Sequence, residues 1–184
     1  MRYAALFRGI NVGGKNIVKM ADLTALLIDL GLNKVKTYVQ SGNVVFETDL
    51  GELDICERIK NAFLQRFHFE SNVIVRTQDE MRSLIKHLPF TTEEITEAEN
   101  ANLEVEHLYV YFLDDRPNLQ KLEIISQEFA HSDKFQTENK EIYFLCHQSI
   151  RNSKLAARLS KAFSASTVRN WNTVQKLYDM MLNL

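Results

Sequence analysis

The sequence predicts an α+β protein with antiparallel sheets, and three observations lead to this fold class. The first half of the chain alternates strand-like and helix-like apolar spacing in the order β-α-β-β-α-β. The second half repeats that order, and QSGN (40–43) and TENK (137–140) have the composition of hairpin turns. The duplication is one of pattern only, because no residue-level repeat is found. We therefore expect two tandem ferredoxin-like (split βαβ) subdomains plus a C-terminal helix.

The elements of the first half follow from the spacing of apolar residues. We expect a strand, a helix, two strands, a helix and a strand over residues 3–10, 23–30, 35–39, 44–48, 49–67 and 72–76. Gly31 follows the first helix as a left-handed stop. Asp49 and Glu52 have the spacing of a capping box for the second helix, whose buried stripe would include Leu53 and Phe63. A further helix begins at a second capping box, Thr77 with Glu80, and stops before Pro89.

An acidic stretch separates the two halves. Residues 89–106 contain six glutamates, all between 93 and 106, and we interpret them as a solvated linker with a short helix at 93–99. Subdomain 1 is then 1–88 and subdomain 2 is 107–184. The elements expected in the second half are strands at 108–113, around 135, 142–146 and 166–170, and helices at 119–129, 155–163 and from 171.

Composition excludes several functional classes. The 184 residues carry a net charge of -2 and are 45% hydrophobic, as in ordinary globular proteins. No run approaches the roughly 20 apolar residues of a membrane span, and no signal peptide opens the chain, so a cytoplasmic protein without a membrane partner is expected. The five histidines have no metal-ligand spacing, so we expect no metal and no cofactor. Cys56 lies on a helical apolar stripe, which favours a buried, inert thiol, and Cys146 and His147 face opposite sides of a strand.

The segment RGINVGGKN (8–16) differs by one residue from the phosphate-binding pattern G-x-x-x-x-G-K-[ST]. Asn16 stands where the hydroxyl that binds Mg²⁺ is required. The next helix begins too late, and the two hairpins indicate an antiparallel sheet, whereas a P-loop domain needs a parallel one. We therefore interpret the segment as a glycine-bent loop rather than a P-loop.

This loop is still a candidate anion site. Its glycines permit the positive φ angles that an amide nest needs, and Arg8 and Lys15 add positive charge. In a split βαβ fold the first two strands are parallel, so the loop lies beside QSGN. Near the other end of the chain, RNWNT offers an arginine that can hold a phosphate in a fork, the only Trp, and an asparagine that can cap the last helix. The candidate ligand-binding residues are Arg8, Asn11, Gly13, Gly14, Lys15, Gln40, Ser41, Asn43, Arg169, Asn170 and Trp171. Ordinary turns and a Trp that anchors the last helix are the structural alternatives.

The segments RGINVGGKN, TYVQSGNVVF (37–46) and VRNWNTVQKL (168–177), taken together, resemble the signature segments of a bacterial family catalogued as domain of unknown function 1697. The resemblance implies a cytosolic protein of two ferredoxin-like subdomains and implies no activity. The positions that match the family's motifs are Arg8, Gly9, Asn11, Gly13, Gly14, Gln40, Ser41, Gly42, Asn43, Arg169, Asn170, Trp171 and Thr173.

The favoured function is binding of a small anionic or phosphate-bearing ligand, such as a nucleotide, in a cleft near the 8–15 loop. RNA or single-stranded nucleic-acid binding is an alternative, because the ends of the chain are basic and the split βαβ order is also that of the RRM. The first and third strands of subdomain 2 carry Tyr109, Tyr111 and Tyr143 for base stacking, although such rings more often form core. An enzyme acting on phosphorylated substrates, with Ser41 or a water as nucleophile, lacks a positioned general base. A scaffold without a ligand is the remaining alternative, and the oligomeric state is left open.

Overall fold

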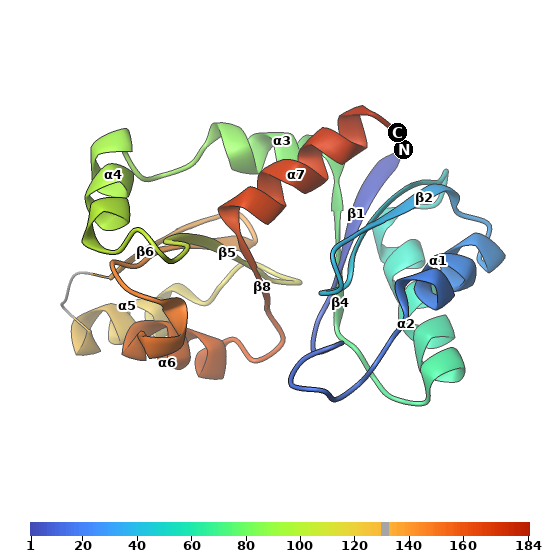
Figure 1. Ribbon diagram of the computed structural model, residues 1–184, viewed down its shortest axis with the longest axis horizontal. Helices are drawn as coiled ribbons and strands as arrows, with labels where there is room; N and C mark the ends of the chain where they lie inside the picture. The colour runs from blue at the N-terminus through green and yellow to red at the C-terminus, as the bar shows by residue number, and fades with distance from the viewer. Residues whose placement is uncertain (130–132) are drawn as a thin grey trace. The chain divides into compact units, whose positions relative to one another are not determined.

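The computed structural model describes residues 1–129 and 133–184, and the chain divides into two compact units (Figure 1). Unit 1 comprises Met1–Lys86 together with Gln175–Leu184, and unit 2 comprises His87–Val174. The last helix, α7 (Trp171–Leu182), begins in unit 2 and ends in unit 1. Each unit is described by itself below.

Unit 1 is built on a four-stranded antiparallel sheet with the order β2-β3-β1-β4. Its elements are β1 (Arg2–Phe7), α1 (Met20–Asp29), β2 (Asn33–Tyr38), β3 (Asn43–Glu47), α2 (Glu52–Phe67), β4 (Val73–Thr77) and α3 (Gln78–Lys86). The central strand β1 pairs with both β3 and β4, so its carboxyl end lies in the middle of one edge of the sheet. The loop that follows β1 is therefore held by its neighbours on both sides.

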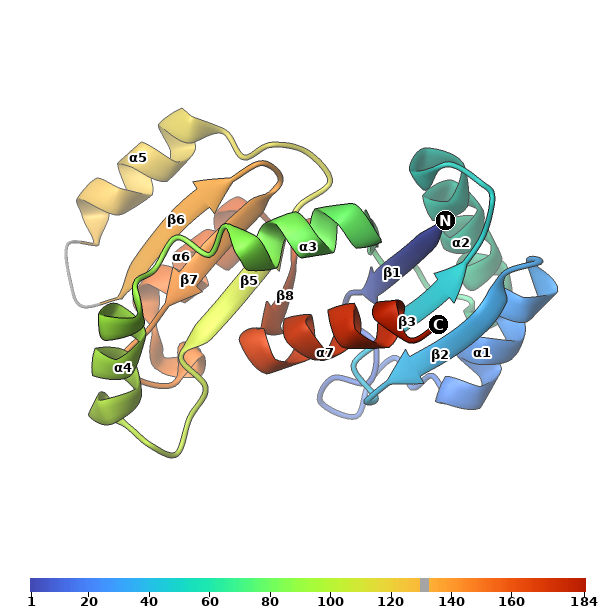
Figure 2. The same ribbon diagram turned by 90° about the horizontal axis from the view of Figure 1, so that it is seen from above.

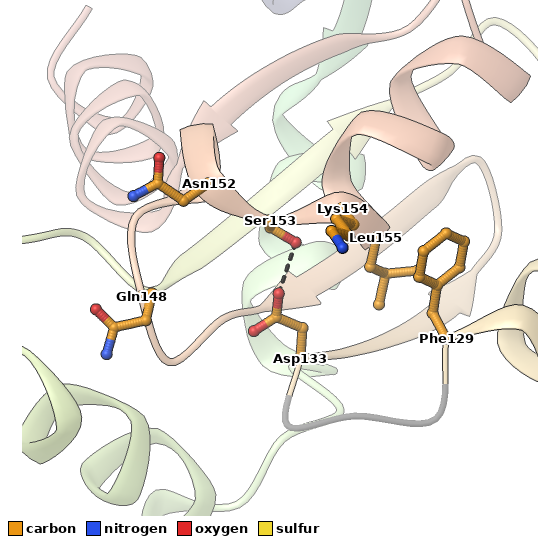
Figure 3. Close-up of a pocket in the computed structure, with 7 residues that line it drawn as sticks. All are labelled: Phe129, Asp133, Gln148, Asn152, Ser153, Lys154 and Leu155. Carbon is orange, nitrogen blue, oxygen red and sulfur yellow. Dashed lines mark hydrogen bonds between the residues drawn. The ribbon is translucent and has the colours of Figure 1, made fainter.

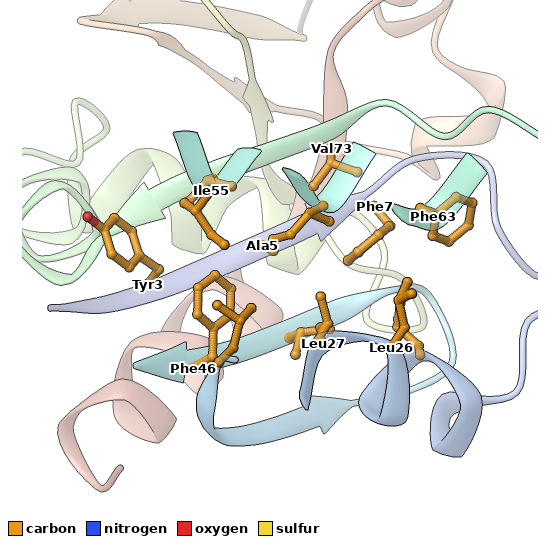
Figure 4. Packing of buried hydrophobic residues seen from close by; sticks show 14 of the residues in the cluster. Tyr3, Ala5, Phe7, Leu26, Leu27, Phe46, Ile55, Phe63 and Val73 are labelled. Atoms are coloured by element: carbon orange, nitrogen blue, oxygen red, sulfur yellow. The ribbon is translucent and has the colours of Figure 1, made fainter. Parts of the chain in front are cut away.

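The core of unit 1 lies between the sheet and the two helices α1 and α2 (Figure 4). Alternate residues of β1, namely Tyr3, Ala5 and Phe7, point to this side because strand side chains alternate between faces. Figure 4 shows them facing Leu27 of α1 and Phe63 of α2, and all five are at most 1% exposed. Burial of each large side chain contributes about 1.5–3 kcal/mol, so this layer holds β1 firmly in register.

Unit 2 repeats the same topology with the order β6-β7-β5-β8. Its elements are α4 (Thr92–Ala101), β5 (Leu108–Phe112), α5 (Leu119–Glu128), β6 (Lys134–Glu138), β7 (Glu141–Leu145), the short 3-10 helix η1 (Ile150–Asn152), α6 (Lys154–Ala162) and β8 (Thr167–Asn170). Figure 1 shows α5 and α6 below this sheet, and in Figure 2, the view from above, α6 lies behind it. Two antiparallel sheets of split βαβ connectivity, with a helix at the C-terminus, confirm the predicted fold class.

Two helix starts test the capping predictions. The box at Thr77 and Glu80 is confirmed, because Thr77 Oγ1 accepts from Glu80 N at 3.2 Å and Glu80 Oε2 accepts from Thr77 N at 2.8 Å. The box at Asp49 is wrong: α2 begins at Glu52, after Gly51, which has no side chain to cap it. The buried stripe shifts with it, so that Leu53 is 85% exposed and Ile55 takes its place in the core.

The acidic stretch is more ordered than its composition indicates. It contains the ten-residue helix α4, which begins at a capping box formed by Thr91 and Glu94. Glu94 also pairs with Lys134 at 2.9 Å, and these contacts lower the pKa of its carboxyl. A run of glutamates near a helix N-terminus is favoured because the helix dipole is positive there. In the described parts of the chain, no helix has the length and apolar character needed to cross a membrane.

Candidate functional site

The segment that resembles a P-loop is a miniature β-hairpin. Asn11 N donates to Asn16 O at 3.0 Å, and Lys15 N donates to Val12 O at 3.1 Å. Gly13 and Gly14 form the turn between Val12 and Lys15. Their φ angles are 58° and 73°, as a two-residue type I′ turn requires. Glycine is the residue that adopts this conformation without a steric penalty. The predicted positive φ angles are confirmed, and the backbone geometry is that of a hairpin.

Asn11 ties this hairpin to the rest of unit 1. Its side-chain amide donates to Val18 O at 2.9 Å and to Gln40 O at 2.8 Å, and its Oδ1 accepts from Val18 N at 2.8 Å. In addition, Phe7 N donates to Gly42 O at 2.8 Å. The loop after β1 thus lies beside the 40–43 turn, as the parallel arrangement of β1 and β2 predicts. The role of Asn11 in this structure is to position the loop.

The turn between β2 and β3 is shaped by packing and by a strained residue. Gly42 has a φ of 75°, and a Cβ built there would stand 2.6 Å from Ile10 and 2.7 Å from Phe7, so no larger residue fits. Asn43 is buried, and its amide donates to Tyr38 O and to Ser41 Oγ. Val39 has a φ of 49°, which is unfavourable for a β-branched side chain.

The exposed part of this edge combines positive charge, free amides and apolar side chains. Lys15 and Lys19 are exposed, and the first acidic residue of the chain is Asp22. The N–H groups of Gly13 and Gly14 donate no hydrogen bond within 1–129 and 133–184. Val12 and Ile17 are each 65% exposed beside them. This edge can therefore receive an anion by backbone N–H groups and lysines together.

The third predicted segment lies at the end of β8 in unit 2. Asn170 Oδ1 accepts from Thr173 N at 3.0 Å, which confirms that Asn170 can cap the last helix. The Arg169 guanidinium donates to Thr167 Oγ1 and to Val168 O. Burial lowers its pKa to about 10, so it stays charged at neutral pH. Trp171 is half-buried.

Arg8, the first of the predicted ligand-binding residues, directly follows β1 in unit 1. Its backbone N donates to Asn72 O, and its backbone O accepts from Ser71 Oγ.

The thiols and the imidazole that nucleophilic or metal chemistry would use are buried, as Cys146 and His107 are, or partly buried, as Cys56 is. Burial raises the pKa of the Cys146 thiol to about 12, so it stays protonated, and its Sγ donates to His107 O. Both ring nitrogens of His107 lie against carbonyl oxygens, of Cys146 at 2.6 Å and of Asn102 at 2.8 Å. Cys56 donates to Val73 O at 3.1 Å. No group of three metal-ligating side chains occurs in the described parts of the chain.

The aromatic rings considered for RNA stacking are mostly buried. Tyr111 and Tyr143 are at most 1% exposed, and Tyr111 packs edge-on against Phe144 at 6.1 Å between ring centroids. Tyr109 is partly buried in the same sheet. A ring must present its face to solvent to stack on a base, so Tyr111 and Tyr143 belong to the fold.

A pocket that the sequence reasoning missed opens in unit 2 (Figure 3). Its volume is about 380 Å³. The lining residues are Phe129, Asp133, Gln148, Asn152, Ser153, Lys154 and Leu155. They come from two stretches of the chain, at 129 and 133 and between 148 and 155, and none of these residues belongs to a recognisable motif. The one signal in the sequence is Ser153, which directly precedes α6 and has the position of an ordinary N-cap.

The fold and the loop after β1 define an α+β protein of two split βαβ units, with a glycine-bent, basic hairpin after its first strand. The sequence model of a protein family of unknown function (DUF1697) matches residues 1–143, and the chain belongs to that family. This confirms the resemblance to the family, and two of the three motifs, 8–16 and 37–46, lie within the matched residues.

A solved structure agrees with the fold over the whole chain. The conserved bacterial protein SP0830 from Streptococcus pneumoniae is similar with a TM-score of 0.76 and 25% sequence identity. The similarity covers 98% of this chain and 98% of that chain. No curated protein shows significant sequence similarity.

Proposed function

We propose that this protein binds a small anionic or phosphate-bearing ligand, such as a nucleotide, at the hairpin Asn11–Asn16. The observation that carries the proposal is the pair of exposed N–H groups of Gly13 and Gly14 beside Lys15. Adjacent amides that point into solvent bind anions because they offer partial positive charge at fixed positions. A lysine next to them supplies a full charge and a further donor.

The rest of the edge supports the same ligand class. Asn11 holds the hairpin against the 40–43 turn, so the exposed Gln40 is available from a second element. Lys19 adds charge at the start of α1. The exposed Val12 and Ile17 offer apolar contact to the organic part of a nucleotide. We further propose that the exposed Ser41, on the same 40–43 turn, takes part.

Calorimetric titration with ATP and with inorganic pyrophosphate at about 50 mM salt tests the proposal. The Lys15→Ala and Lys19→Ala variants are compared with Lys86→Ala, which removes an exposed lysine from the end of α3 in the same unit. We expect saturable binding that Lys15→Ala weakens by about three- to tenfold, the range of an exposed charge-assisted contact. Lys86→Ala should leave the affinity unchanged. Absence of binding to either probe, or equal losses in all three variants, would contradict the proposal.

A further inference from the structure

We propose that unit 2 carries a separate binding site for a free aliphatic amino acid, in the pocket lined by Asp133 and Lys154 (Figure 3). The pocket holds about 380 Å³, within the range of small-molecule sites. It joins the end of α5, the start of β6, the segment after β7 and the first turn of α6. Its lining offers an acid, a base and an apolar wall, and these three parts match the three parts of an amino acid.

Asp133 is the acceptor for the ammonium group. Its Oδ2 accepts from Ser153 Oγ at 2.6 Å, and its Oδ1 accepts from His147 N at 3.2 Å. Neither donor carries a full positive charge, and Asp133 forms no ion pair with a base in 1–129 or 133–184. An ionised carboxylate has about four acceptor positions, so these two bonds leave room for an ammonium donor. The same two bonds fix the carboxylate in place, which lowers the entropy cost of binding.

Lys154 is the donor for the carboxylate group. It is exposed and stands at the first position of α6, and it forms no ion pair in the described residues. The first turn of α6 has no acidic residue, so the charge there is positive. Asn152 also lines the pocket, and Figure 3 shows its amide on the Gln148 side, away from Lys154.

Phe129 and Leu155 form the apolar wall. Figure 3 shows the Phe129 ring beside Leu155, on the side of the pocket away from Gln148. Leu155 is 4% exposed, so the core of unit 2 fixes it and it contributes only a small part of the wall, while the partly buried Phe129 contributes most of it. An aliphatic side chain on this wall gains about 25 cal/mol for each Å² that it buries.

The pairing of charges selects a zwitterion over simple ions. A monocarboxylate would gain Lys154 and meet repulsion from Asp133, and a monoamine would gain Asp133 and meet repulsion from Lys154. Only a ligand with both charges uses both partners. This argument concerns unit 2 alone and is independent of the anion site proposed in unit 1.

The test is a ¹⁵N–¹H NMR titration of the full chain with L-leucine up to about 10 mM. The matched probes are 3-methylbutylamine, which lacks the carboxylate, and 4-methylpentanoate, which lacks the ammonium group. We expect L-leucine to shift the amide signals of residues 147–156 saturably. Each single-charge analogue should bind at least about tenfold more weakly.

Two variants assign the contacts. Lys154→Met keeps the apolar stem of an exposed residue, so the fold is preserved, and it should abolish the preference for L-leucine over 3-methylbutylamine. Lys161→Met, at the exposed far end of the same helix, is the control and should bind like the unchanged protein. The proposal is overturned if L-leucine shifts no signal in 147–156, if both analogues bind as well as L-leucine, or if the two lysine variants behave alike.

Discussion

At the residue scale, two turn glycines are required for different physical reasons. Gly14 and Gly42 both have positive φ angles, 73° and 75°. A Cβ on Gly14 would meet nothing within 4 Å, whereas a Cβ on Gly42 would collide with Ile10 and Phe7. The sequence indicates positive φ at both positions, but a close approach between two segments can be known only from the structure.

We predict that Gly42→Ala destabilises the protein more than Gly14→Ala. The Gly14 variant bears only the cost of a left-handed alanine, about 1–2 kcal/mol. The Gly42 variant bears a similar cost plus overpacking, about 1–3 kcal/mol more. Urea denaturation of the two variants measures the difference in free energy of unfolding. Equal losses would show that Ile10 and Phe7 do not crowd Gly42.

Tyr109 gives a prediction for alkaline pH. Burial raises its pKa to about 12, whereas an unfolded tyrosine has a pKa of about 10. A raised folded pKa contributes stability below about pH 10, and this contribution is lost as the pH rises towards 12, because the unfolded chain ionises first. We expect the free energy of unfolding of Tyr109→Phe to fall less between pH 9 and pH 11 than that of the unchanged protein. Parallel pH profiles of the two proteins would contradict this expectation.

At the scale of elements, the hairpin Asn11–Asn16 shows why a near match to the P-loop pattern does not indicate a P-loop here. The letters of a P-loop are nearly complete, yet the two glycines form the turn of a hairpin rather than leading directly into a helix. Two successive φ angles above zero match the right-handed twist of paired strands. The fold, and not the count of matching letters, decides what such a segment does.

Asn11 should stabilise this element far more than Asn16. Asn11 forms three hydrogen bonds that join the hairpin to Val18 and to the 40–43 turn, whereas the side chain of Asn16 donates one exposed bond to Gly9 O. We predict that Asn11→Ala costs about 1–3 kcal/mol and weakens pyrophosphate binding, while Asn16→Ala costs about 1 kcal/mol or less. Urea denaturation and calorimetric titration measure both effects. A larger loss of stability in Asn16→Ala would contradict the positioning role of Asn11.

A short repeat between the units became visible only in the structure. Arg76 of β4 pairs with Ala4 of β1, and Arg169 of β8 pairs with Val110 of β5, so both arginines hold equivalent positions. In each unit the next residue, Thr77 or Asn170, caps the following helix. Two residues are too few to reveal a repeat in the sequence, and only the strand register aligns them.

At the scale of the whole molecule, the fold class follows from the sequence because each element carries its own periodicity. Strands such as Arg2–Phe7 and the helix Trp171–Leu182 are found where the apolar spacing predicts them. The start of α2 was missed, because Asp49 and Glu52 have capping spacing but Gly51 takes the N-cap position. Local spacing cannot decide between two neighbouring caps when packing of Ile55 into the core sets the helix phase.

The candidate site could be predicted only in part. Topology alone places the 8–16 loop beside the 40–43 turn, because the ends of parallel strands share an edge. Packing roles for Gly42 and Asn43 were not foreseen, since both depend on contacts between segments. The pocket around Asp133 and Lys154 was missed for the same reason: its residues meet only when two loops and a helix fold together.

The most direct test of the anion site is to follow the amide signals of Gly13 and Gly14 by ¹⁵N–¹H NMR during a titration with inorganic pyrophosphate. Both N–H groups are free of hydrogen bonds in the described parts of the chain, so an anion that binds there must deshield them. We predict saturable downfield shifts of these two signals, which need about three- to tenfold more pyrophosphate in Lys15→Ala and are weakened by added salt. Signals of Gly13 and Gly14 that stay unmoved while the anion binds elsewhere, or no binding at all, would contradict the account.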